Sequence, residues 1–129
     1  MHILIAEDDS TSREILAKIC RKSGEHHVAL AEDGQVAWAL LDDPKRWFDV
    51  VFLDVQMPEL GGLDVLQRVR QSAVYRSIEV VMCTASNDRA TITKAMSLGV
   101  RHYIVKPCSE AAVTEKLKVI DQKRLAEAR

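Results

Sequence analysis

Residues 48–54 have the sequence FDVVFLD, and VQMP follows immediately at residues 55–58. A mostly apolar run of this length that ends before a proline turn is typical of a central strand buried on both faces. We therefore expect a strand over residues 49–54 whose last residue, Asp54, emerges at the carboxyl edge of a sheet. Open α/β sheets bind ligands at this edge. Asp54 is therefore the first candidate functional residue.

A second group of acidic residues follows the first expected strand. Residues 2–6 (HILIA) are followed at once by Glu7, Asp8 and Asp9. If the two strands are neighbours, their carboxylates lie at one edge and raise each other's pKa unless a cation intervenes. Hard divalent ions such as Mg²⁺ prefer oxygen ligands of this kind. The sequence therefore predicts a cation site.

The rest of the chain alternates between short apolar runs and segments with helical spacing. Further strands are expected at residues 27–31, 79–84 and 102–105. Helices are expected after Asp9 or Ser10, over residues 35–41, around Leu63, Leu66 and Val69, after Asn87 or Asp88, and after Ser109. Alternating strands and helices predict parallel strands with right-handed crossovers. The expected fold is α/β, a doubly wound five-stranded parallel sheet with five helices on its two faces.

Individual residues are expected to begin, end or bury these helices. Glycine is predicted to end two of them, at Gly24 and at Gly99 in a left-handed conformation. The first helix should carry a Thr11–Glu14 capping-box pair and an apolar stripe. The expected apolar positions are Ile15, Leu16, Ile19 and Cys20 in the first helix, Ile92, Ala95 and Met96 in the fourth, and Val113, Leu117 and Ile120 in the last.

Length and charge limit the class of protein. A chain of 129 residues is expected to form a single domain over residues 1–129. Its net charge of −1, from 18 basic and 19 acidic residues, gives no general attraction to nucleic acid or to an anionic membrane. No apolar run approaches the ~20 residues that span a bilayer. We expect no direct nucleic-acid binding and no membrane segment.

The cysteines indicate a reducing compartment. Cys20, Cys83 and Cys108 are odd in number and never form a C-x-x-C pair. This usage fits reduced thiols in a cytoplasmic protein. All three are interpreted as small packing residues.

Four groups of residues stand at the ends of the expected strands. They are Glu7-Asp8, then Asp54 with Met57-Pro58 and Gly62, then Thr84-Ala85, and finally Tyr103 with Lys106-Pro107. In this order the chain resembles the receiver domain of bacterial two-component response regulators over essentially its whole length. The resemblance implies the strand order 2-1-3-4-5, which would bring Glu7, Asp8 and Asp54 together, and a cis Lys106–Pro107 bond.

The resemblance also implies a role for each residue. Asp54 would be the phosphoacceptor, and Thr84 and Lys106 would contact the phosphoryl group. Mg²⁺ or Mn²⁺ would be held by Asp8, Asp54 and the backbone carbonyl of Gln56, with Glu7 acting mainly through water. Thr84 and Tyr103 would switch the face formed by helix four, strand five and helix five. Gln56 and Ser86 would tune dephosphorylation.

Implied partners follow from these roles. A sensor histidine kinase or phosphotransfer protein would supply the phosphoryl group, and a downstream protein or an absent output domain would receive the signal. The charged residues 121–129 could link to such a domain, and the switch face could form a homodimer. The protein would be a signalling phosphoacceptor that catalyses its own Mg²⁺-dependent phosphorylation and dephosphorylation, rather than an enzyme in the ordinary sense.

Three other functions share parts of this pattern. A phosphatase of the haloacid dehalogenase type needs a second aspartate two residues after the nucleophile, where Gln56 stands. A flavodoxin-like cofactor binder would hold a phosphate in its first loop, which Glu7-Asp8-Asp9 would repel. An inactive receiver that serves as an interaction module typically lacks an acid or the lysine, and both are present here. Gly61 and Cys108 depart from the residue types common in the family.

Overall fold

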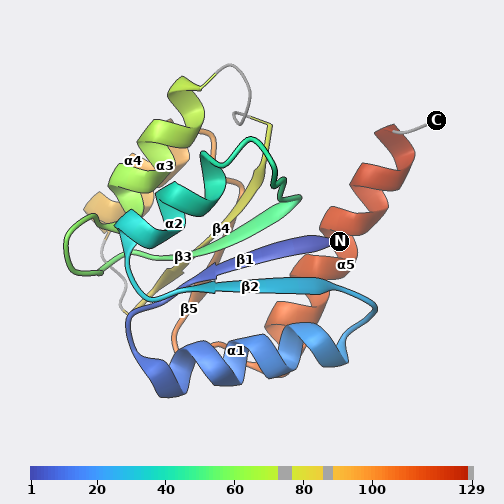
Figure 1. The fold of residues 1–129 in the computed structure, drawn as a ribbon. Coiled ribbons are helices and arrows are strands. Elements are labelled where there is room, and N and C mark those ends of the chain that lie inside the picture. Colours follow the sequence, from blue (N-terminus) through green and yellow to red (C-terminus); the bar gives the residue numbers. More distant parts are fainter. Residues whose placement is uncertain (73–76, 86–88, 128–129) are drawn as a thin grey trace.

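The central sheet is built from five parallel strands within the described residues, 1–72, 77–85 and 89–127, of the computed structural model. The strand order is β2-β1-β3-β4-β5, which confirms the predicted topology (Figure 1). The elements in chain order are β1 (His2–Ala6), α1 (Ser10–Lys22), β2 (His27–Ala31), α2 (Gly34–Leu41), β3 (Val50–Asp54), α3 (Gly62–Gln71), β4 (Glu79–Thr84), α4 (Arg89–Ser97), β5 (His102–Val105) and α5 (Glu110–Glu127).

Alternation along β3 explains why its sequence is apolar throughout. Val51 and Leu53 lie in the core shared with α2, α3 and α4, whereas Val50 and Phe52 lie in the core shared with α1 and α5. None of these four side chains is exposed to solvent, because helices cover both faces of the sheet (Figure 1). The two layers of helices confirm the doubly wound architecture.

Strand register aligns the residues at the carboxyl edge. Ala6, the last residue of β1, pairs with Leu53 of β3, and Asp54 pairs with Cys83 of β4. Glu7 directly follows Ala6, and Asp54 directly follows its partner Leu53 on the adjacent strand. This register places the acidic residues of two strands side by side.

The first helix begins two residues earlier than the predicted capping box requires. Asp9 is its N-cap and accepts a hydrogen bond from the backbone N–H of Ser12 at 2.8 Å. Asp9 was one of the two predicted caps, but the predicted Thr11–Glu14 capping box is wrong, because Thr11 lies inside the helix and cannot be its N-cap. Leu16 and Cys20 are buried as predicted, but Ile15 is 51% exposed. The helix ends at Lys22, two residues before Gly24.

The later helix boundaries agree more closely with expectation. Gly99 adopts the predicted left-handed conformation, with φ 84°. Ser109 Oγ accepts a hydrogen bond from the Ala112 N–H at 3.1 Å at the start of α5, whose Val113, Leu117 and Ile120 are buried as predicted. In α4, Ala95 is buried but Met96 is 61% exposed. The cap predicted at Asn87 or Asp88 lies outside the described residues.

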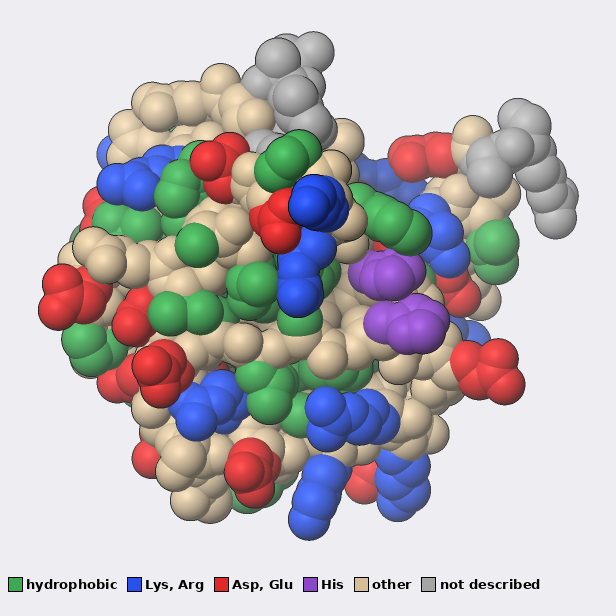
Figure 2. Space-filling view, in the orientation of Figure 1, with side chains coloured by type: hydrophobic (Ala, Val, Ile, Leu, Met, Phe, Trp, Pro, Cys, Tyr) green, Lys and Arg blue, Asp and Glu red, His purple; other side chains and the backbone are tan. Residues whose placement is uncertain are grey.

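The surface has no strong single-sign character on the face seen in Figure 2, where acidic and basic side chains both occur. Among the described helices, none is both long enough and apolar enough to span a membrane.

Candidate functional site

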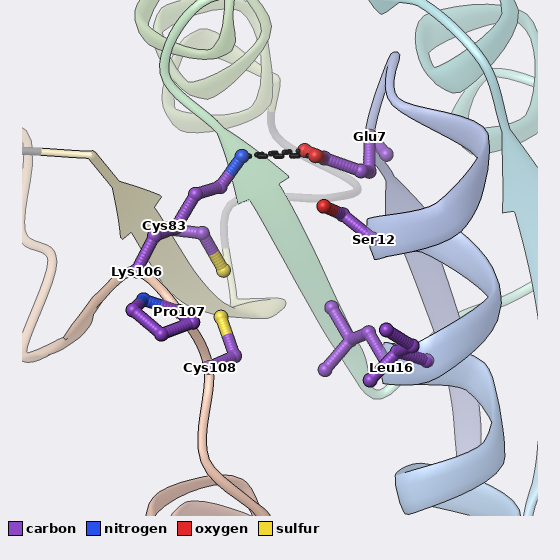
Figure 3. Close-up of a pocket in the computed structure, with 9 residues that line it drawn as sticks. Glu7, Ser12, Leu16, Cys83, Lys106, Pro107 and Cys108 are labelled. Atoms are coloured by element: carbon purple, nitrogen blue, oxygen red, sulfur yellow. Dashed lines mark hydrogen bonds and ion pairs between the residues drawn. The ribbon is translucent and has the colours of Figure 1, made fainter.

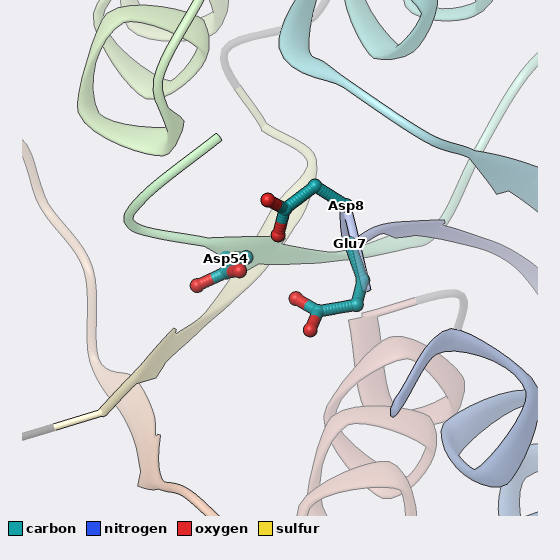
Figure 4. Close-up of side chains that lie close together, drawn as sticks. All are labelled: Glu7, Asp8 and Asp54. Atoms are coloured by element: carbon teal, nitrogen blue, oxygen red, sulfur yellow. The ribbon is translucent and has the colours of Figure 1, made fainter. Parts of the chain in front are cut away.

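Three carboxylates meet at the carboxyl edge of the sheet. Glu7 and Asp8 directly follow β1, and Asp54 ends β3 (Figure 4). One oxygen from each residue lies within 4.8 Å of one oxygen of the other two. Glu7 and Asp54 are only 4% and 6% exposed, whereas Asp8 is open to solvent. The predicted acidic cluster is therefore formed, and its oxygen ligands suit a hard divalent cation.

Lys106 reaches this cluster from the end of β5. Its Nζ lies 2.9 Å from both carboxylate oxygens of Glu7 and 3.0 Å from Oδ2 of Asp54. The Lys106 backbone N–H donates to the Thr84 carbonyl at 2.7 Å, so β4 holds the residue in place. The Lys106–Pro107 bond is cis, as the resemblance implied. The direct pairing of Lys106 with Glu7 was not predicted from the sequence.

Burial and charge together shift the pKa values of Glu7 and Lys106. Burial and, to a smaller extent, the nearby Asp54 raise the pKa of Glu7, Lys106 partly offsets both, and the pKa is about 7 in all. Burial lowers the pKa of Lys106, but its hydrogen bonds to Glu7 and Asp54 outweigh this and raise the pKa overall. The ammonium therefore stays charged, while a second negative charge at Glu7 is costly near neutral pH. The expected mutual repulsion is confirmed for Glu7, although burial is the larger cause.

A cavity of about 310 Å³ opens above the cluster. Asp54, Thr84 and Lys106 all line it, together with Gln56. Thr84 ends β4 and is 4% exposed, and the Gln56 backbone N–H lies 3.4 Å from Oδ1 of Asp54. Residues from four separate segments thus face one space large enough for a small anionic group.

Two residues of this region were not predicted. Arg13 of α1 donates from Nη1 to the Glu7 carbonyl at 2.8 Å and so fixes the backbone of the acidic turn. Thr91 of α4 lines the cavity. Neither belongs to a recognisable motif. Their positions depend on how α1 and α4 pack at the sheet edge.

Two predicted residues lie outside the cavity or cannot be placed. Tyr103, on β5, does not line the cavity and is 46% exposed. Ser86 lies outside the described residues. The structure therefore brings together the expected phosphoryl-contacting and metal-ligating residues, and it leaves Tyr103, for which a switch role was expected, at the surface.

Comparison with known proteins identifies the arrangement. Residues 3–118 match the family model of the response regulator receiver domain. The chain belongs to the response regulator receiver family.

Relatives of this receiver domain include chemotaxis proteins of similar length. It is 36% identical to chemotaxis protein CheY1 of Helicobacter pylori, over 93% of this chain and 96% of that protein. It is 38% identical to chemotaxis protein CheY-3 of Vibrio cholerae, over 93% and 91% of the two chains. The Mn²⁺-bound form of response regulator Rcp1 shares its fold, with a TM-score of 0.78, 22% identity, and coverage of 93% and 91%.

Family membership decides among the candidate functions. This receiver domain has the phosphoacceptor signalling role of CheY-like response regulators. The phosphatase and cofactor-binding alternatives are not favoured, and neither is an inactive interaction module, since Asp54, Lys106 and the acidic pair are all present and adjacent.

Proposed function

We propose that Asp54 accepts the phosphoryl group, in the cytoplasm, from a phosphohistidine of a sensor histidine kinase or phosphotransfer protein. The observation that carries this proposal is the placement of a nearly buried Asp54 on the cavity wall, 3.0 Å from the Lys106 ammonium. One Asp54 oxygen would bond to phosphorus as the phosphorus–nitrogen bond breaks, and the histidine nitrogen would keep the electron pair.

The donor set at the site suits Mg²⁺ or Mn²⁺. Asp8, Asp54 and the Gln56 backbone carbonyl would hold the ion, and Glu7 would act mainly through water. The tight grouping of three carboxylate oxygens supports this assignment, as does the Mn²⁺ named for Rcp1, which has the same fold. When bound, the ion neutralises negative charge on the carboxylates and phosphoryl oxygens.

Lys106 and Thr84 would stabilise the transferring group. Phosphoryl transfer depends mainly on positioning and on charge stabilisation of the equatorial oxygens. Lys106 already lies against the Asp54 carboxylate, so its ammonium would meet an oxygen of a phosphoryl group attached there. The Thr84 hydroxyl, at the end of the next strand, would donate to another oxygen. The protein would thereby catalyse its own metal-dependent phosphorylation.

Dephosphorylation would depend on residues close to Asp54. The side chain of Gln56 is not needed for the metal, so its amide could orient the attacking water, as amides do in other phosphoryl-transfer sites. Ser86 would flank the same path. Its assignment rests on sequence position alone.

Signal output would use the face of α4, β5 and α5. Thr84 would move toward the phosphoryl group, and Tyr103 on the adjacent strand would change rotamer in response. This face carries exposed apolar side chains, including Met96, Tyr103 and Val105, which support contact with another protein. The occupant would be a downstream target, a second copy of the chain, or an output domain linked through the charged end of α5 in a protein whose receiver domain is residues 1–129.

Intact-mass measurement after incubation with acetyl phosphate tests the proposal. The wild-type chain should gain one phosphoryl group when Mg²⁺ is present and none when it is chelated. Asp54→Asn should gain none, because an amide cannot form the acyl phosphate. Asp64→Asn, at an exposed position in the first turn of α3, is the matched control and should behave like wild type. Uptake by Asp54→Asn at the wild-type rate would refute the assignment.

A further inference from the structure

A second cavity, which shares Glu7 and Lys106 with the first, lies between α1 and the segment that follows β5. Its volume is about 310 Å³, and its walls include Ile15, Leu16, Pro107 and two cysteines, Cys83 and Cys108 (Figure 3). None of the phosphoryl-transfer roles proposed above uses these thiols.

The two thiols face each other across a short gap. Cys83 is the next-to-last residue of β4 and is 3% exposed, whereas Cys108 is half-buried. Both cysteines line the cavity, and Figure 3 shows their sulfur atoms directed toward the same space. Their separation of 25 positions in the sequence gave no sign of this contact, so both were interpreted only as packing residues.

We propose that Cys83 and Cys108 form an oxidation site at which a hydroperoxide converts the two thiols into a disulfide. Cys108 sulfur attacks the outer oxygen of the hydroperoxide, the oxygen–oxygen bond breaks, and an alcohol (water, in the case of hydrogen peroxide) leaves. Cys83 sulfur then attacks the resulting sulfenic acid at Cys108 and releases water. The two thiols lose two electrons in all, and the hydroperoxide gains them.

The surroundings assign the order of these steps. Cys108 lines the open cavity and so meets the oxidant first, while Cys83 is buried behind it. The adjacent Cys83 thiol also lowers the pKa of Cys108 to about 7, which favours the reactive thiolate. Cys20 offers an internal comparison, because it is fully buried and burial raises its pKa to about 12.

The link would join two segments that carry phosphoryl-contacting residues. Cys83 immediately precedes Thr84, and Cys108 lies two residues after Lys106. The disulfide would therefore tether the end of β4 to the Lys106–Pro107 turn without involving any of the carboxylates that would hold a metal. Oxidation would restrain the movement of Thr84 that the switch requires.

Peptide mapping of the full chain treated with hydrogen peroxide tests the proposal without any phosphodonor. Wild type and Cys20→Ala should each lose two hydrogen atoms, yield a cross-linked pair of tryptic peptides containing Cys83 and Cys108, and recover with dithiothreitol. Cys83→Ala should instead trap a dimedone adduct at Cys108, and Cys108→Ser should form neither product. A wild-type chain that forms no intramolecular Cys83–Cys108 link, or that reacts first at Cys20 or between two molecules, would overturn the proposal. Because no phosphoryl group is measured, this outcome is independent of the role of Asp54.

Discussion

Replacing Glu7 by glutamine should change how the stability of the metal-free protein depends on pH. The pKa of Glu7 rises from 4.5 to about 7 in the folded protein, because burial and the nearby Asp54 together outweigh the opposing effect of Lys106. The folded state therefore binds the proton more tightly than the unfolded state does. The contribution of Glu7 to stability is then fully present below pH 4.5 and is lost as the pH rises through about 7.

The magnitude follows from the size of this rise. A tenfold change in proton affinity is worth about 1.4 kcal/mol, so a rise from 4.5 to about 7 corresponds to about 3 kcal/mol. Because this loss arises from ionising Glu7, Glu7→Gln should remove most of it.

Urea unfolding in the presence of a chelator, repeated across this pH range, measures the effect. The free energy of unfolding of wild type minus that of Glu7→Gln should fall by about 3 kcal/mol between pH 4.5 and pH values above about 7. Glu14→Gln, at an exposed position on α1, is the matched control and should keep the wild-type profile. Excess Mg²⁺ should flatten the difference, because a cation favours the ionised cluster. A difference that stays constant with pH in metal-free buffer would refute the reasoning.

Three further predictions concern the backbone, the switch and the phosphorylated lifetime. Gly62→Ala would place a Cβ 2.1 Å from the Asp54 carbonyl oxygen, so it should lower the free energy of unfolding in urea by at least about 2 kcal/mol. The control Gly61→Ala, whose nearest contact would be 3.3 Å, should lower it by less than about 1 kcal/mol. Equal losses in the two variants would contradict the steric argument. Thr84→Ala should still accept a phosphoryl group but lose the amide chemical-shift changes in α4 and β5 that beryllofluoride causes in wild type; unchanged long-range shifts would show that another route carries the signal. Gln56→Ala should slow loss of the phosphoryl group, followed by mass spectrometry, by about threefold or more, and an unchanged decay rate would exclude Gln56 from water positioning.

The predictions that succeeded from sequence rest on local patterns. The run at residues 48–54 indicated a strand buried on both faces, and Val50 to Leu53 are completely buried. Predicted bounds for β1, β2, β4 and β5 match the structure, and β3 begins one residue later than expected, at Val50. Alternation of strand and helix was enough to predict the parallel, doubly wound sheet, because handed crossovers allow few other arrangements.

Local patterns failed where burial depends on the neighbouring element. Ile15 and Met96 fit the helical spacing of their apolar stripes, yet they are 51% and 61% exposed. Ile15 lies beside the cavity near the sheet edge, where the core no longer covers it. In α4 only Ala95 reaches full burial. Helical periodicity gives the face of a helix, but not how much of that face its neighbours cover.

The amino-acid pattern alone fixed which residue types stand at the ends of the strands, because strand length and side-chain alternation are properties of the local backbone. The resemblance to receiver domains then gave each residue an expected role. Only the folded chain determined the contacts between distant segments. Lys106 and Glu7 pair across 99 positions, and the Cys83 and Cys108 thiols meet because β4 and β5 are adjacent and the chain turns at Pro107. Such distances depend on strand register and on the path of the connecting loops, which no short stretch of sequence encodes.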